Sequence, residues 1–225
     1  MPKTSKQFYT ELGHAGLAER KTKTQTKKEL PYLLKLLEKN KKILDLACGY
    51  GRFTIPLAKK GYDIEGIDIT PALIQKAKET ARKDRLEEVK FRIGDMRKLP
   101  YENESFDSVI CTWTAFSELY QEKDQVIAIK EILRALRRKG FAFIETRYER
   151  TAPKFIKDVD GDIEIRKIGK RAIVGNISGI ETMPQYAHNK STLRTLMKKS
   201  KVKRYQIRVG DFGGRRRLLL QFWKM

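Results

Sequence analysis

The most informative stretch of this 225-residue chain is Asp45-Leu46-Ala47-Cys48-Gly49-Tyr50-Gly51-Arg52. It continues an apolar run that begins at Ile43, which is typical of a strand buried on both faces of a parallel sheet. Its two glycines allow positive φ angles and leave room for a ligand against the main chain. Residues 51–60 then return to a helical pattern. The stretch therefore predicts a ligand-binding turn between a strand and a helix.

Strand and helix patterns alternate around this turn. We expect strands over residues 43–47, 62–68, 89–93, 106–112 and 141–147, with helices over 27–39, 51–60, 71–84 and 122–138. A final helix over 190–199 and two strands over 203–209 and 216–223 complete the pattern. Such alternation predicts an α/β fold with a doubly wound, mostly parallel sheet of seven strands.

Residues 151–189 break this rhythm. Two alternating stretches flank a turn candidate at 167–170, which predicts a β-hairpin insertion after the fifth strand. We therefore divide the chain into N-terminal cap helices plus core (1–150), a hairpin lid (151–189), and the closing helix and strands (190–225). Residues 158–162 resemble a calcium loop but lack the later bidentate Glu, so we expect a turn there and no metal site.

Polar groups follow the ends of the predicted strands. Asp68 ends the second strand, 19 residues after Gly49, where a carboxylate can accept both hydroxyls of a ribose. Asp95 ends the third strand and can accept from an exocyclic amine, while Met96 can pack on a flat ring. Purely structural alternatives remain open: Asp68 fits a cap of the helix that starts at Pro71, and Asp95 fits a turn.

Together these residues resemble class I S-adenosylmethionine-dependent methyltransferases over about residues 40–150. The loop lacks the third glycine of a dinucleotide fingerprint, because Thr54 stands at that place, so a nicotinamide or flavin site fits less well. The resemblance implies a Rossmann-like fold with S-adenosylmethionine as cofactor. By the same resemblance, the methionine half of the cofactor would lie on Ala47, Gly49 and Gly51 near Thr112, and its ribose on Asp68. The adenine would lie beside Ile69, Asp95 and Met96, and Asp45 would orient the loop.

Catalytic residues are harder to predict, because methyl transfer depends mainly on positioning and needs a base only when the acceptor arrives protonated. The weak candidates are His188, His14 and Tyr9. His188 fits a base or substrate ligand under the lid, and equally a surface loop, which we favour. His14 and Tyr9 belong to the N-terminal segment that, by resemblance, covers the cofactor.

Sequence features favour a small-molecule acceptor. The fourth strand is not followed by the Asn/Asp-Pro-Pro-Tyr/Phe run of enzymes that methylate exocyclic amines of bases, and the chain has no Pro-Cys pair to attack a pyrimidine. The insertion resembles the lid of the family's small-molecule members. Two alternatives remain: a methyltransferase acting on RNA or another polyanion, and a non-catalytic cofactor-binding module.

Charge keeps the RNA alternative open. Lys and Arg total 49 against 28 Asp and Glu, a net charge of +21. Residues 1–42 contribute +7 and residues 151–225 contribute +12, whereas the central segment is nearly neutral. Basic flanks attract phosphates on RNA or on a small acidic substrate, or form a solvated surface. Two cysteines and no apolar leader favour a cytoplasmic protein without a membrane partner.

Overall fold

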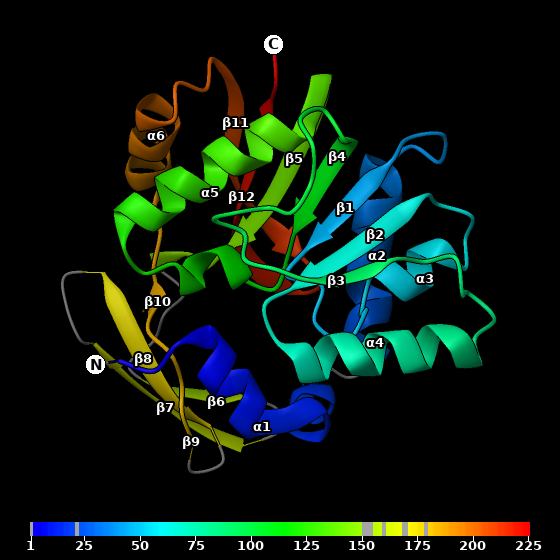
Figure 1. Cartoon of the computed structure of the whole chain (residues 1–225). Coiled ribbons are helices and arrows are strands. Elements are labelled where there is room, and N and C mark those ends of the chain that lie inside the picture. Colours follow the sequence, from blue (N-terminus) through cyan, green and yellow to red (C-terminus); the bar gives the residue numbers. More distant parts are fainter. Residues whose placement is uncertain (1, 21–22, 150–154, 159–160, 168–170, 178–179) are drawn as a thin grey trace.

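The strand that precedes the glycine turn, β1 (Ile43–Leu46), lies at the centre of a seven-stranded sheet. The computed structural model describes residues 2–20, 23–149, 155–158, 161–167, 171–177 and 180–225 (Figure 1). The sheet order is β11-β12-β5-β4-β1-β2-β3. The other strands are β2 (Ile64–Asp68), β3 (Phe91–Ile93), β4 (Phe106–Cys111), β5 (Leu136–Thr146), β11 (Arg204–Phe212) and β12 (Arg215–Trp223). The predicted doubly wound α/β fold is confirmed.

Parallel pairing joins β1 through β5, whereas β12 runs antiparallel to both β5 and β11. The chain moves from β1 outward to β2 and β3, then returns to β4 on the other side of β1. The carboxyl ends of β1 and β4 therefore flank the topological switch point, where ligands of such sheets bind.

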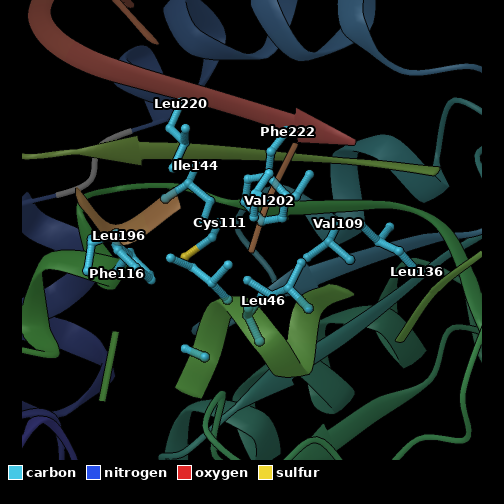
Figure 2. Close-up of a cluster of buried hydrophobic side chains, with 14 of the residues drawn as sticks. Leu46, Val109, Cys111, Phe116, Leu136, Ile144, Leu196, Val202, Leu220 and Phe222 are labelled. Carbon is cyan, nitrogen blue, oxygen red and sulfur yellow. The ribbon is translucent and has the colours of Figure 1, made fainter. Parts of the chain in front are cut away.

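Helices cover both faces of the sheet. One face packs against α2 (Lys23–Leu36), α3 (Thr54–Ala58) and α4 (Pro71–Lys83), and the other against α5 (Glu122–Ala135) and α6 (Lys190–Lys199). Alternation along β1 divides its side chains between the two faces. Leu44 and Leu46 enter the cluster beneath α5 and α6, shown in Figure 2, while Ile43 enters the cluster beneath α2.

The insertion is larger than predicted. The expected hairpin is present as β7 (Gly161–Lys167) and β8 (Ala172–Ile177), and β6 (Phe155–Asp158), β9 (Ile180–Glu181) and β10 (Gln185–Tyr186) extend it to a five-stranded antiparallel sheet. This second sheet lies beyond the carboxyl edge of the main sheet (Figure 1). Residues 159–160 and 168–170, parts of the two predicted turns, lie outside the described residues.

Several helix boundaries differ from the sequence prediction, since α2 (Lys23–Leu36) and α3 (Thr54–Ala58) stand where 27–39 and 51–60 were expected. The N-terminal segment forms α1 (Ser5–Arg20), broken at Gly13, where φ is 69°. The helix α5 ends at Ala135 rather than near residue 138. Leu136 instead opens β5, because its side chain is fully buried and its backbone pairs with Phe106 of β4. Among the described residues, no helix is both long and apolar enough to cross a membrane.

Candidate functional site

A cavity of about 370 Å³ lies at the carboxyl edge of the sheet, at the switch point. Its floor comes from the ends of β1, β2, β3 and β4. Its cover comes from residues 2–6 and Tyr9 of the N-terminal segment and from Met183 and Pro184 of the insertion. Figure 1 shows α1 lying across this edge. The volume is in the range of sites that enclose a small molecule or cofactor.

The loop after β1 is held in a tight conformation. Ala47, Gly49 and Gly51 have φ angles of 62°, 57° and 81°, in the left-handed region that disfavours side chains. Ala47 and Gly49 line the cavity. Gly51 is not among the lining residues. A Cβ at Gly51 would meet the Ile55 side chain of α3 at 2.9 Å. Gly51 therefore lets the loop pack against α3, and it is not part of the predicted cofactor floor.

Asp68 connects this loop to the next strand. Its Oδ2 accepts the backbone N–H of Gly49 at 2.9 Å, and its Oδ1 accepts that of Thr70 at 2.9 Å. Thr70 is the N-cap of α4, so Asp68 holds the residue that precedes the helix. The side chain is 8% exposed and lines the cavity. Because each carboxylate oxygen can accept two hydrogen bonds, acceptor capacity remains for a ligand.

Asp95, Met96 and Ile69 all line the part of the cavity next to β2 and β3. Asp95 forms an ion pair with Arg97 at 2.6 Å and accepts the Arg97 backbone N–H at 2.8 Å. Burial opposes ionisation of Asp95, but these hydrogen bonds and the Arg97 charge together lower its pKa. Asp95 is thus a turn residue, as the alternative interpretation predicted, and it is also a negatively charged group beside the cavity.

Asp45 supports the loop from behind. It does not line the cavity; its side chain lies on the α3 face, 1% exposed, where its Oδ2 accepts the Thr54 hydroxyl at 2.7 Å. Burial raises the pKa of Asp45 to about 6. The contact with Thr54 ties the end of β1 to the start of α3, which fits the orienting part that the resemblance implies.

The segment after β4 closes one side of the cavity. Thr112, Trp113 and Ala115 line it, and the 3₁₀ helix η1 (Ala115–Glu118) follows. Trp113 and Thr114 have φ angles of 58° and 57°, a costly pair of conformations for non-glycine residues. The Thr114 backbone N–H donates to buried Glu145 Oε2 at 2.9 Å, which holds this turn in place.

The catalytic candidates separate into one at the cavity and two away from it. Tyr9 lines the cavity, and its hydroxyl donates to Glu118 Oε1 at 2.6 Å. His14 lies against Tyr50 and does not line the cavity. His188 is fully buried between Phe116 and Tyr186, so the favoured surface-loop interpretation is wrong.

Burial, and then the charge of Arg171, lower the pKa of His188 to about 3. At neutral pH this side chain is therefore a neutral ring in an apolar setting. Its nitrogens make no hydrogen bond to a described residue. The geometry assigns it to packing beneath the insertion rather than to the cavity.

Seven of the nine residues predicted to bind the cofactor line one cavity: Ala47, Gly49, Asp68, Ile69, Asp95, Met96 and Thr112. Sequence reasoning missed several charged lining residues, namely Lys3, Lys6, Arg97, Glu118 and Asp124. Lys3 and Lys6 lie in a Lys-rich segment with no motif, and Glu118 follows a turn with no glycine. Arg97, two residues after Asp95, was the one with a usable local signal.

Comparison with known proteins agrees with this geometry. A family model described as "Methyltransferase domain" matches residues 37–204. The chain is 31% identical over 118 residues to the uncharacterized methyltransferase C1B3.06c of Schizosaccharomyces pombe, covering 49% of this chain and 41% of that protein.

Solved structures extend the likeness over nearly the whole chain. The PH0226 protein of Pyrococcus horikoshii OT3 superposes with a TM-score of 0.66 at 26% identity, covering 96% of this chain and 95% of the other. CalS10 of Micromonospora echinaspora, an amino pentose methyltransferase solved with S-adenosylmethionine bound, superposes with a TM-score of 0.68 at 16% identity, covering 92% and 95%.

Proposed function

The chain belongs to the methyltransferase domain family, whose S-adenosylmethionine-dependent chemistry suits the cavity, and from that premise we propose that it methylates a small molecule. The observation that carries the proposal is the convergence of seven predicted cofactor residues on one covered cavity. The chain spans less than half the length of the curated relatives that it matches. The activity of the whole protein is therefore inferred from the site and the fold.

The polar and apolar groups that line the cavity fit this cofactor. Asp68 ends β2 with acceptor capacity for ribose hydroxyls. Asp95 and Met96 offer an acceptor and an apolar surface to the adenine, next to Ile69. Ala47 and Gly49 leave the main chain accessible on the methionine side, near Thr112. When bound, S-adenosylmethionine supplies an activated methyl group on a sulfonium.

The residues of this chain would act mainly by positioning. The strained turn at Trp113 and Thr114 and the N-terminal cover confine the acceptor and exclude water, which is the main requirement for in-line displacement. A nucleophilic atom of the acceptor forms the new bond to carbon while the carbon–sulfur bond breaks and its electron pair stays on sulfur. If the acceptor carries a proton, Tyr9 and Glu118 are the nearby hydrogen-bonded pair that could hold it.

A small acceptor suits the covered cavity better than a polymer does. The N-terminal segment and the insertion both contribute lining residues, so the space beyond the strand ends is partly covered. CalS10, which shares this fold, is an amino pentose methyltransferase. The net charge of +21 supports RNA as a second candidate, and a binding test of that candidate is given below.

Calorimetry with S-adenosylhomocysteine tests the cofactor site. We expect the parent to bind at micromolar concentration and Asp68→Ala to bind about 30-fold more weakly, because a charge-assisted acceptor worth about 2 kcal/mol is lost. Asp63→Ala is the matched control, since Asp63 is exposed at the other end of the same strand. Absence of binding to the parent at about 1 mM would refute the proposal that the protein is a methyltransferase enzyme. Equal affinity in Asp68→Ala would refute the ribose assignment.

A further inference from the structure

Three arginines lie at the carboxyl edge of the sheet beside the proposed cofactor site. Arg147 directly follows β5, and Arg215 and Arg217 begin β12. Since β12 runs antiparallel to β5 with Leu218 opposite Thr146, these ends coincide. The residues assigned to the cofactor belong to β1, β2, β3 and β4, so the arginines occupy the next positions along the same edge.

Arg147 is held at this edge with most of its donors unused. Its Nε donates to Gln185 Oε1 at 2.8 Å, and its backbone N–H donates to the Ser117 hydroxyl at 3.1 Å. Gln185 follows the lining residue Pro184, and Ser117 precedes the lining residue Glu118. The two terminal nitrogens of Arg147 donate to none of the residues that the structure describes. Arg147 does not itself line the cavity, but its guanidinium is fixed through neighbours of two lining residues, with four N–H groups that donate to no described residue.

The acids nearby already have other partners, since Glu118 accepts from Tyr9 and the other two acids pair with arginines. Glu145 Oε1 lies 2.6 Å from Arg217 Nε, and Glu29 pairs with Arg52. Burial, then the charges of Arg217 and Arg215, lower the pKa of Arg147 to about 10 despite Glu145 and Glu118. The cluster thus carries more positive charge than its described acids offset, which is the electrostatic condition for binding an anion.

Trp113 links this cluster to the cavity. The Arg52 guanidinium lies 4.7 Å from the centroid of its ring, and that of Arg215 lies 4.6 Å from it. Trp113 itself lines the cavity. Arg52 is 7% exposed, and its Nη1 makes no hydrogen bond to a described residue. A buried donor without a partner beside an aromatic wall is a second sign of a ligand.

We propose that the methyl acceptor is a small anion whose carboxylate or phosphate group binds Arg147 and Arg217 beside Trp113. This inference rests on the proposed function and names the chemical class of its acceptor. Arginine presents a planar pair of donors that matches a carboxylate or phosphate. An anionic group held at the end of β5 leaves the rest of the acceptor directed along the edge toward the end of β4, where the methyl group would be presented.

Calorimetry on the protein saturated with S-adenosylhomocysteine tests the proposal with three probes: benzoate, phenyl phosphate and neutral benzamide. We expect at least one anion to bind at about millimolar concentration and benzamide to bind at least about tenfold more weakly. The stronger of the two anions identifies a carboxylate or a phosphate as the recognised group. Binding of neither anion below about 50 mM, or equal binding of benzamide, overturns the proposal.

Variants locate the anion. Arg147→Gln should weaken anion binding about tenfold, Arg147→Lys should weaken it less, and Arg194→Gln, at an exposed position on α6, should leave it unchanged. Arg217→Gln gives a second reading if Arg147→Gln does not fold. Anion affinity equal to the parent in these cluster variants refutes the site. Anion binding without any S-adenosylhomocysteine binding would instead refute the proposed function and leave the anion site standing.

Discussion

Asp45 and Asp68 illustrate how position decides the use of two buried carboxylates on adjacent strands. Asp45 lies on the α3 face of β1 and is occupied by Thr54, whereas Asp68 lies at the end of β2 and faces the cavity. Spacing from Gly49 predicted the second placement, because parallel strands end at a common edge. The partner Thr54, nine residues after Asp45, could not be predicted, since it depends on how α3 packs on the sheet.

The burial of His188 could not be predicted for a related reason. It stands between Ala187 and Asn189 in a short mixed stretch with no clear apolar period, so the local sequence does not indicate burial. Its apolar neighbours Phe116 and Tyr186 come from η1 and from the insertion, so its environment exists only after the second sheet docks. The parallel bridge between Tyr148 and His188 fixes this docking.

His188 should make the protein sensitive to mild acid. In the unfolded chain it takes up a proton near pH 6.5, whereas the folded protein holds its pKa at about 3. Between these values the unfolded state binds more protons, so stability falls as pH falls through this window. At about pH 5 the loss is about 2 kcal/mol. We expect His188→Met to lose about 2 kcal/mol less than the parent between about pH 7.5 and pH 5 in urea unfolding.

The same substitution at His14 serves as the control. His14 is only partly buried, and burial, then Lys76, lower its pKa to a smaller extent. His14→Met should therefore change the pH dependence of stability much less than His188→Met does. Parallel stability curves for the parent and His188→Met would show that the ring is solvated in solution.

At the scale of elements, predictions followed apolar periodicity and failed where periodicity is weak. The central strands β1, β2 and β4 were located because their residues are buried on both faces, whereas the edge strands β3 and β11 are largely exposed and were located by short apolar or alternating runs. N-terminal cap helices were predicted, but the bounds of α1 were not, because its apolar residues mark a face only weakly and Gly13 and Gly16 interrupt its sequence. The insertion has more strands than the predicted hairpin. The strands β9 and β10 could not be predicted because two residues are too few for an alternating pattern.

The helix α1 should control release of the cofactor product. Tyr9 connects it to η1 through the hydrogen bond to Glu118, and the first turn of α1 covers the cavity. Tyr9→Phe removes this charge-assisted bond, worth about 1 kcal/mol. We expect S-adenosylhomocysteine to dissociate about fivefold faster from the variant in stopped-flow fluorescence. Tyr205→Phe, on exposed β11, is the matched control, and equal rates in both variants would mean that α1 does not gate the site.

For the whole molecule, the fold divides the basic tail between two parts of the sheet. Arg204 pairs with Trp223, which pairs with Phe141 in the middle of β5, opposite the start of β4, so Arg204 lies away from the carboxyl edge that holds the cavity. Arg215 and Arg217 lie at the cavity edge. The sequence places both groups in one segment of 75 residues with a charge of +12, and only the strand pairing separates them.

This division leads us to expect weak binding of RNA. The cluster of Lys198, Lys199, Lys201, Lys203 and Arg204 offers at most five cations, of which Lys199 already pairs with Glu122 and Arg204 lies away from the cavity edge. Counterion release then limits the slope of log affinity against log salt to about −4, and retardation of bulk tRNA should vanish by about 150 mM salt. Replacing Lys198, Lys201 and Lys203 with Gln should reduce retardation at low salt and leave S-adenosylhomocysteine affinity unchanged. Submicromolar binding at about 150 mM salt, strengthened by S-adenosylhomocysteine, would instead favour RNA as the acceptor, because only a polymer that reaches the cavity would couple the two sites.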